Sequence, residues 1–293
     1  MNTQSAETIK SYALIAPAFG FVCVLLLVPI VQNVYYSFFE YDGFSKPYFV
    51  GLENYAELLT DSEFLGSLFN TFIWVAFTLC FPVFGGLLIA IFIRNLLFQN
   101  LFKTIFYLPL TISFVSTAVM WKYMYSLELG VVNTLLSSIL GRKITIGWLT
   151  EVPLNTFSLI FAWTWQQLGT NMVLFLMGLT TIPKSPVEAA IMDGANSWQT
   201  FWHVTLPMLK PITTVVVTMA IVNSFKVFDL IYVMTNGGPY HSSETLTLTM
   251  FKKAFVLSRM GYGSAISIVL SMFVIIFSGA YILRSKKKDQ LHF

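Results

Sequence analysis

The chain contains several long runs of apolar residues, and their length limits what it can fold into. The hydrocarbon core of a bilayer is about 30 Å thick, and about 20 apolar residues cross it as an α-helix. Runs of this length without two-residue alternation favour helices over a transmembrane barrel. The sequence therefore predicts an all-α polytopic membrane protein with six transmembrane helices, near residues 12–38, 68–93, 104–125, 154–179, 209–234 and 262–284.

The composition supports a membrane protein and argues against other classes. Of the 293 residues, 56% are hydrophobic and 11% are charged, whereas soluble proteins carry about 25% charged residues. The formal net charge of +3 is too small to predict a nucleic-acid partner. Cys23 and Cys80 both lie inside apolar runs, which excludes a disulfide scaffold.

The distribution of Lys and Arg predicts the orientation in the membrane. These residues favour cytoplasmic loops, and more of them lie on the side of the termini than on the opposite side. The segment RSKKK beside the last span contributes most of this difference. We therefore expect both termini in the cytoplasm, with an N-terminal arm over residues 1–11, a transmembrane domain over 12–284 and a basic tail over 285–293.

The loop between the fourth and fifth spans, residues 180–208, is predicted to form two short helices joined by a turn. Ser185, Pro186 and Glu188 match a helix start, with a capping oxygen, a proline in the first turn and a carboxylate three residues on. The first helix is therefore expected from Pro186 to Asp193. Gly194 then supplies the positive φ that closes such a helix.

Asn196 and Gln199 repeat the capping pattern for a second helix, which Pro207 and Pro211 are expected to limit. Spacing alone is equally satisfied by a helical hairpin that lies on the membrane surface. Large aromatic side chains that suit the interface occur in the second helix: Trp198, Phe201 and Trp202.

The residues of this loop carry a family resemblance. The stretch EAAIMDGANSWQTFWHVTLP, Glu188 to Pro207, resembles the EAA loop of membrane subunits of binding-protein-dependent ABC importers. The resemblance covers nearly the whole chain and is closest to permeases of the maltose and glycerol-3-phosphate type. Further matching stretches are FKVFDLIYVMTNGGPYHSSETLTL from Phe225 to Leu248, FKTIFYLPLTIS from Phe102, WKYMYS and GVVNTLL between Trp121 and Leu136, and GLTTIP ending at Pro183.

The resemblance implies a division of labour between several proteins. The chain would be a permease, not an enzyme, and would hold no cofactor, because ATP and Mg²⁺ are bound by a separate ATPase. The expected partners are two ATPase subunits, an extracytoplasmic solute-binding protein that docks on the outer loops, and a second permease that is a related chain or a copy of this one. The residues carried over to the ATPase-coupling surface are Glu188, Ala189, Ala190, Asp193 and Gly194.

The sequence itself agrees with this division. It contains no glycine-rich phosphate loop ending in Gly-Lys-Ser/Thr. The small Ala189 and Ala190 permit close approach by a partner, and Glu188 can pair with a basic residue there. The alternative role for Glu188 is to cap the helix without contacting a partner protein. Pro186 and Val187 replace the Leu-Tyr pair frequent in the family, and proline early in a helix preserves its geometry.

Two ionisable residues at membrane depth are candidates for the substrate pathway. Lys226 and Asp229 are three residues apart on the fifth span, so one helical face would bring them together as a pair. They are expected near the outer mouth of the pathway. The alternative is a structural ion pair that contacts another helix.

The fourth span supplies aromatic and amide side chains, which suit the apolar faces and hydroxyl groups of a sugar. Gln167 and Asn171 are four residues apart and share a face with Trp163, while Asn223 on the fifth span can join the same pathway. Helix packing through amide hydrogen bonds is the alternative interpretation. The candidate pathway residues are therefore Trp163, Gln166, Gln167, Asn171, Asn223, Lys226 and Asp229.

The sequence analysis thus indicates the permease subunit of a carbohydrate importer in the inner membrane of a bacterial or archaeal cell. The expected solute is a di- or oligosaccharide, with glycerol phosphate or another sugar derivative as the alternative. An ion-coupled secondary transporter is disfavoured because the chain shows neither more spans nor an internal repeat. An intramembrane enzyme would need a metal-binding or nucleophile motif, and the sequence contains none. His203 and His241 have no partner ligands at metal spacing.

Overall fold

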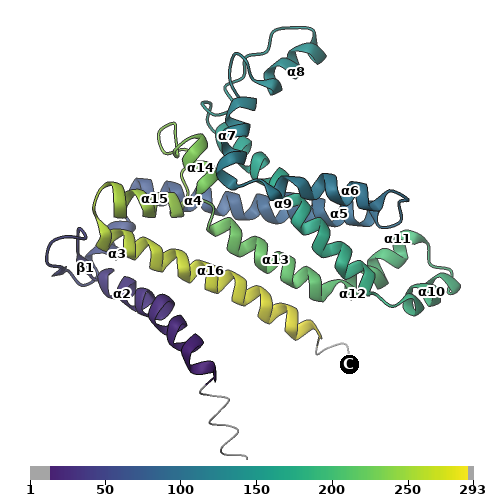
Figure 1. Cartoon of the computed structure of the whole chain (residues 1–293), viewed down its shortest axis with the longest axis horizontal. Helices are drawn as coiled ribbons and strands as arrows, with labels where there is room; N and C mark the ends of the chain where they lie inside the picture. Colours follow the sequence, from purple (N-terminus) through teal and green to yellow (C-terminus); the bar gives the residue numbers. More distant parts are fainter. Residues whose placement is uncertain (1–13, 290–293) are drawn as a thin grey trace, which may run out of the picture. The chain divides into compact units, whose positions relative to one another are not determined.

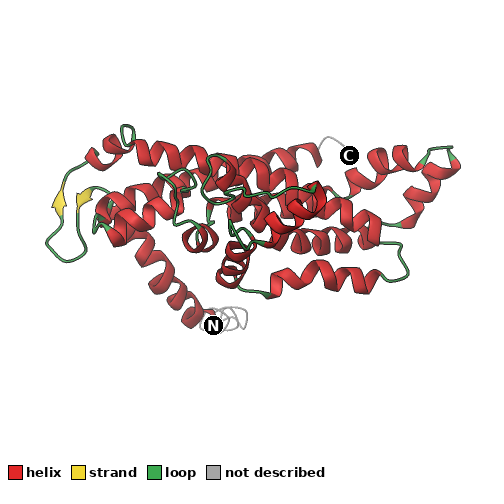
Figure 2. Ribbon diagram, turned by 90° about the horizontal axis from the view of Figure 1, so that it is seen from above, coloured by secondary structure: helices red, strands yellow, loops and turns green. Residues whose placement is uncertain are grey.

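The computed structural model describes residues 14–289, which form helices and one short hairpin (Figures 1 and 2). The arm expected over residues 1–11 and the end of the tail, 290–293, lie outside the described residues. The chain divides into two units. One comprises the described part of Met1–Asp61 together with Met250–Ser271, and the other comprises Ser62–Thr249 together with the described part of Met272–Phe293.

The first unit contains the first candidate span and four short elements of the described chain. A helix over Leu14–Tyr36 contains a π-helical turn at Cys23–Leu27 and ends as α2 (Val28–Tyr36). Its Asn33 amide donates a 3.1 Å hydrogen bond to Ser267 of α16, the last helix. The remaining elements are the antiparallel strands β1 (Phe39–Glu40) and β2 (Tyr48–Phe49), α3 (Glu53–Leu58), a π-helical turn at Lys252–Val256 and the start of α16 (Met260–Asp289).

Charged side chains join the short elements of this unit. The Arg259 guanidinium donates two hydrogen bonds to the Glu57 carboxylate, at 2.7 and 2.6 Å, and these raise the pKa of Arg259 above its ordinary value. The loop after β1 is closed by Asp42, which accepts the backbone N–H groups of Phe44 and Ser45. These bonds stabilise the carboxylate and lower the pKa of Asp42.

The second unit is a helical bundle with the 28-residue helix α9 at its centre. Helices α4, α5, α6, α7, α13 and α14 all contact α9, and Figure 1 shows α8 projecting from this bundle. The helices of the unit before α9 are α4 (Ser62–Thr78), α5 (Phe84–Ile93), α6 (Gln99–Tyr107), α7 (Phe114–Met124) and α8 (Val131–Leu140). From α9 onward they are α9 (Leu154–Thr181), α10 (Lys184–Met192), α11 (Ser197–Thr200), α12 (Leu206–Met208), α13 (Lys210–Phe225), α14 (Asp229–Met234) and α15 (Leu246–Phe251).

Within residues 14–289, four helices are long and apolar enough to cross a membrane: Leu14–Tyr36, Ser62–Ile93, Lys210–Met234 and Met260–Ser285. They match the first, second, fifth and sixth spans expected from the sequence. A fifth candidate is the pair Gln99–Thr111 and Phe114–Met124, which is bent by 97°. The described residues therefore form an all-α polytopic membrane protein with four to five candidate spans. The third span expected near 104–125 corresponds to the bent pair.

Helix α9 occupies the place of the expected fourth span, but its composition keeps it out of this group. It carries polar side chains such as Asn155, Gln166 and Asn171, and the bundle buries all three. A helix enclosed by other helices meets protein on most of its surface, so it does not need an apolar exterior. The last helix also differs from expectation, because α16 continues to Asp289 through the first residues of the expected basic tail.

Close helix contacts are made possible by local sequence features of the second span. Pro82 lies in a π-helical turn at Leu79–Val83, which joins α4 to α5 without ending the span. Gly86 follows, and a Cβ atom there would lie 2.6 Å from Cβ of Asn171. The absence of a side chain at Gly86 therefore sets how closely α5 approaches α9.

Candidate functional site

The first arm of the expected coupling hairpin is α10, which begins earlier than predicted. Its N-cap is Pro183, in an extended conformation with φ −59° and ψ 143°, and no side chain caps the helix. Ser185 lies inside the helix, so its predicted capping role is wrong. The physical reason is Pro183, which disfavours a helical conformation at Ile182 and lets the helix restart directly after it.

The turn at the end of α10 follows the prediction closely. Asp193 is the C-cap, and Gly194 has φ +84°. The Gly194 N–H donates to the carbonyl of Ile191 at 3.0 Å, and the Ala195 N–H donates to that of Ala190 at 2.9 Å. These two bonds define a Schellman motif, which satisfies carbonyls at the helix end and fixes the direction in which the chain leaves.

The second arm begins with the expected capping box. Asn196 Oδ1 accepts the Gln199 N–H, and Gln199 Oε1 accepts the Asn196 N–H, both at 2.9 Å. The arm then runs through α11, a π-helical turn at Phe201–Thr205 and α12. Pro207 lies just after the π-helical turn and does not interrupt the arm, which ends at Met208, between the two prolines expected to limit it.

The residues expected to contact an ATPase lie on an accessible surface. Glu188, Ala189 and Asp193 are exposed, and Ala190 is half-buried. On another side of α10, Val187 and Ile191 line a cavity of about 490 Å³ together with residues at the end of α5 and in the second arm. The acidic and small residues of the hairpin are therefore accessible to a partner, while Val187 and Ile191 face a space shared with the end of α5 and the second arm.

A cavity of about 330 Å³ lies beside α9 in the bundle. Trp163 stacks on Phe114 of α7, with 5.1 Å between ring centroids and 14° between the planes, and both residues line the cavity. The lining combines aromatic, amide and charged groups. Of the predicted pathway residues it contains Trp163, Gln167, Asn223, Lys226 and Asp229.

Lys226 and Asp229 reach this cavity through a break in the fifth span. Helix α13 ends at Phe225 and α14 begins at Asp229, so the two residues do not share a helical face as predicted. Both are exposed, and no ion pair joins them within residues 14–289. The predicted pairing is therefore wrong, because the chain unwinds at the residues that were expected to hold a regular helix.

Two threonines that sequence reasoning missed stabilise this break. The Thr247 hydroxyl donates to the Phe225 carbonyl at 2.7 Å, and the Thr245 hydroxyl donates to the Val227 carbonyl at 3.2 Å. A carbonyl freed by an unwound span needs a protein partner in a membrane. The alternating threonines of ETLTLT were the available signal, but their partners are about twenty residues away in sequence.

Asn171 lies in a smaller polar niche of about 10 Å³ that shares lining residues with the main cavity. The niche is lined by Asn171, Thr78 and Thr170, together with Trp163 and Gln167. Three buried atoms that belong to lining residues have no hydrogen-bond partner among the described residues: Trp163 Nε1, Thr78 Oγ1 and Thr170 Oγ1. A space of this size suits about one water molecule or one hydroxyl group.

Gln166 contributes to neither cavity. Its side chain is 1% exposed, and its amide donates a 2.7 Å hydrogen bond to the carbonyl of Ile112, between α6 and α7. For this residue the structure shows the alternative weighed above, in which an amide packs one helix against another.

Comparison with known proteins identifies the family. The family model described as the inner membrane component of a binding-protein-dependent transport system matches residues 82–287. The chain belongs to this family. It is an inner-membrane, multi-pass ABC importer permease that is not itself catalytic and holds no cofactor.

The permease also resembles named relatives over nearly its whole length. It is 35% identical over 283 residues to the osmoprotective compounds uptake permease protein GgtC of Synechocystis sp., covering 94% of this chain and 99% of the relative. It is 33% identical over 301 residues to the lactose transport system permease protein LacF of Rhizobium radiobacter, covering 98% and 100%. The alpha-glucoside permease AglF of Rhizobium meliloti is 34% identical over 281 residues, with 94% and 82% covered.

The fold of the permease matches that of a solved importer. A chain of a bacterial ABC transporter involved in the import of alginate, an acidic polysaccharide, superposes with a TM-score of 0.83 at 22% identity, covering 97% of this chain and 99% of that one. A second structure of such a transporter, in complex with an alginate pentasaccharide-bound periplasmic protein, has the same TM-score at 21% identity, with 96% of each chain covered. At this identity the similarity establishes the fold.

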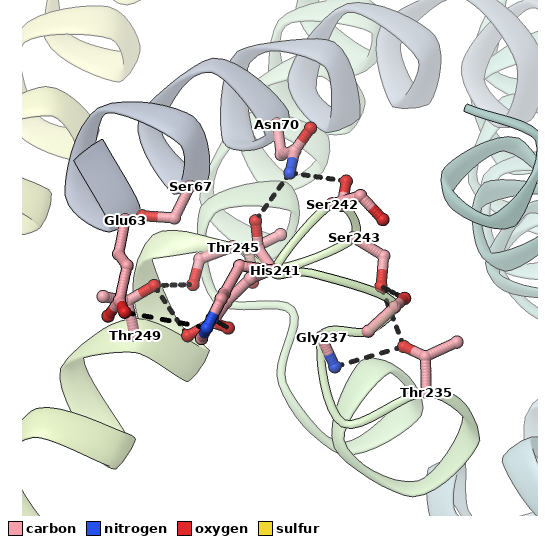
Figure 3. A network of polar contacts seen from close by, with 12 residues as sticks. Glu63, Ser67, Asn70, Thr235, Gly237, His241, Ser242, Ser243, Thr245 and Thr249 are labelled. Carbon is pink, nitrogen blue, oxygen red and sulfur yellow. Dashed lines mark hydrogen bonds and ion pairs between the residues drawn. The ribbon is translucent and has the colours of Figure 1, made fainter. Parts of the chain in front are cut away.

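A network of polar contacts holds the segment after α14 in the permease (Figure 3). Asn70 of α4 donates to the carbonyls of Ser242 and Glu244, at 2.8 and 3.0 Å. His241, whose side chain is 48% exposed, contacts Glu244 at 2.6 Å and Glu63 at 3.6 Å. The network shapes the chain between the broken fifth span and α15.

Proposed function

We propose that this permease carries a di- or oligosaccharide across the inner membrane as one of two permease subunits in an ATP-driven importer. The observation that carries the proposal is the cavity beside α9, where an aromatic stack meets amide, hydroxyl and charged groups. Sugar rings present apolar C–H faces and many hydroxyl groups, and this lining offers partners for both. In this proposal α9 is the buried fourth of six spans, and the bent pair is the third.

The chemistry of the lining favours an uncharged solute. Lys226 and Asp229 contribute one charge of each sign, while Gln167, Thr170 and Asn223 supply neutral donors and acceptors. Relatives named for lactose and alpha-glucoside transport support a saccharide. Glycerol phosphate or another sugar derivative is the second candidate. The relative GgtC is named for osmoprotective compounds and not for a saccharide.

Energy enters through the hairpin formed by α10 and the second arm. An ATPase subunit binds the exposed surface of Glu188, Ala189, Ala190 and Asp193, and Gly194 fixes the angle at which the hairpin transmits movement. The exposure of α10 and the Schellman motif at its end support this assignment. The hairpin and both termini then face the cytoplasm, where two ATPase subunits assemble.

The solute path is completed by a second permease, which we propose to be a related, non-identical chain. Six spans are too few to enclose a roomy sugar path, and the cavity beside α9 has a volume of about 330 Å³. An extracytoplasmic solute-binding protein delivers the saccharide to the outer loops. Mass spectrometry of the assembled complex distinguishes the heterodimer from a homodimer of this chain.

The experiment is transport by the complex purified with its co-eluting ATPase and binding protein and reconstituted in proteoliposomes. A panel of labelled lactose, maltose, maltotriose and glycerol 3-phosphate is tested with the unchanged chain and with Asn223→Ala. Asn100→Ala, an exposed asparagine of α6 outside the cavity, is the matched control. We expect ATP-dependent saccharide uptake that Asn223→Ala lowers by about tenfold, the loss typical of one or two polar contacts.

The proposal fails in its substrate class if glycerol 3-phosphate is the only solute accumulated. It fails for the cavity if Asn223→Ala and Asn100→Ala transport equally well.

A further inference from the structure

The third span is interrupted between two helical segments of nearly equal length. Gln99–Thr111 and Phe114–Met124 meet at 97°, and Ile112 between them is extended, with φ −88° and ψ 135°. Ser113 caps the second segment, because its Oγ accepts the Ser116 N–H at 3.1 Å. Pro109 lies in the last turn before the bend and has no N–H to continue a helix.

A proline permits such a bend but does not fix its angle. Two residues of α9, Gln166 and Gly169, contact the bent segment directly. Gln166 donates its amide to the Ile112 carbonyl at 2.7 Å from a site that is 1% exposed. At Gly169, one turn later, a Cβ atom would lie 2.0 Å from the carbonyl oxygen of Phe106. The backbone at the end of α6 therefore packs directly against the backbone of α9 at Gly169. At the bend, the Gln166 side chain holds the Ile112 carbonyl.

We propose that Gln166 is a positioning residue that holds the third span bent and thereby places one wall of the α9 cavity. Leu110 before the bend and Phe114 after it both line that cavity. Phe114 stacks on Trp163, which is one turn from Gln166 on α9. A change in the angle moves Leu110 and Phe114 relative to each other, so Gln166 shapes the cavity without lining it.

The hydrogen bonding of Gln166 is one-sided. Its Oε1 atom is buried and has no hydrogen-bond partner among the described residues, while its nitrogen holds Ile112. A buried acceptor without a partner disfavours the arrangement that contains it. The bend is thus bound at Ile112 by a single hydrogen bond from Gln166. Replacing Gln166 with leucine leaves the Ile112 carbonyl without this donor, and the cost of that unpaired carbonyl shifts the balance toward a straighter span.

Distance measurement between spin labels tests the bend in the full chain in lipid nanodiscs. The labels are placed at Asn100→Cys and Tyr123→Cys, both exposed, after replacement of Cys23 and Cys80 by serine. With a rise of 1.5 Å per residue, the bent span places these positions about 23 Å apart, and a straight helix places them about 35 Å apart. We expect the short distance in the unchanged chain and a substantial population near the long one in Gln166→Leu.

The matched control is Thr164→Val on the same helix. It removes a hydroxyl that has no hydrogen-bond partner among the described residues, so it should leave the distance unchanged. Gln166→Asn, whose amide is one methylene too short to reach Ile112, should lengthen the distance as well and replaces Gln166→Leu if that variant is poorly folded. Unfolding temperatures measured alongside separate loss of the bend from general loss of structure.

Unchanged short distances in both Gln166 variants would overturn the proposal, as would an equal shift in Thr164→Val. The distances do not depend on which solute is carried, so they test Gln166 even if the proposed saccharide is wrong. The consequence for transport rests on the proposed function. In the assembled importer, Gln166→Leu should lower the solute moved per ATP hydrolysed by about tenfold, whereas Thr164→Val should not.

Discussion

A substitution at Gly194 should change the geometry of the coupling turn while leaving the stability of the bundle nearly unchanged. Gly194 has φ +84°, and a Cβ atom built there would have no neighbouring atom within 4 Å. A side chain at this position therefore meets no steric clash with other parts of the chain. The penalty lies in the backbone, because L-residues with a Cβ atom disfavour positive φ, β-branched residues most of all.

The magnitude follows from this local penalty. A left-handed conformation costs about 1–2 kcal/mol for an ordinary residue, and valine should be at or above the upper end. If the turn relaxes, two backbone hydrogen bonds break and their groups bond to water instead. These are Gly194 N–H to Ile191 at 3.0 Å and Ala195 N–H to Ala190 at 2.9 Å. A penalty of about 2 kcal/mol reduces the population of the native turn about thirtyfold relative to its alternatives. Asparagine tolerates the left-handed region, so Gly194→Asn should lose much less.

The assay measures solute uptake and ATP hydrolysis by the same reconstituted complexes. For Gly194→Val we expect at least a tenfold lower ratio of solute to ATP, with an unfolding temperature of the permease within about 2 °C of the unchanged chain, because the turn is exposed and local. Gly194→Asn should keep most of the coupling. Normal coupling in Gly194→Val would refute the reasoning, and so would equal losses in the two variants.

Three further predictions concern stability. Gly86→Ala should lower the free energy of unfolding by about 1–3 kcal/mol through overpacking against α9, whereas Gly66→Ala, with open space around it, should be neutral or slightly stabilising in the same thermal scans. Asn70→Ala should remove about 1–3 kcal/mol of local stability and speed amide exchange in the segment after α14; protection equal to that of the unchanged chain would contradict its anchoring role. Arg259→Lys should change the unfolding free energy by under about 1 kcal/mol, since both side chains of its pair with Glu57 are more than one-third exposed, and a larger loss in chemical denaturation would show this estimate to be wrong.

The parts of the structure that the sequence predicted well are those determined by neighbouring residues. The Asn196–Gln199 capping box and the positive φ of Gly194 depend on four or five consecutive residues, and both are confirmed. Four apolar spans are also confirmed among the described residues, the fifth span with a break between Phe225 and Asp229, because lipid imposes a uniform composition on their exteriors. The prediction for Ser185 failed because a second start signal lay nearby: Pro183 is the N-cap of the helix, which begins at Lys184 and takes in Ser185.

The candidate site was harder to predict because distant residues complete it. Pro109 was visible in the sequence, but the 97° bend depends on contacts with Gln166 and Gly169, more than fifty residues away. Lys226 and Asp229 have the spacing of a helical pair, yet the chain unwinds between them where distant threonines replace helical hydrogen bonds. Periodicity identifies which residues can share a helix face, and it contains no information about where tertiary partners interrupt the helix.

The central claim is that α10 and the turn at Gly194 are bound by a separate ATPase. Its most direct test is a photo-crosslinking residue, benzoylphenylalanine, at Met192, which is 87% exposed at the end of α10, in the membranes of the native cell. The same residue at Tyr240, 96% exposed beyond α14, provides the comparison from the proposed outer side. We predict that Met192 crosslinks to an ATP-binding subunit and that Tyr240 does not. Crosslinking of Met192 only to lipid or to an extracytoplasmic protein would contradict the account.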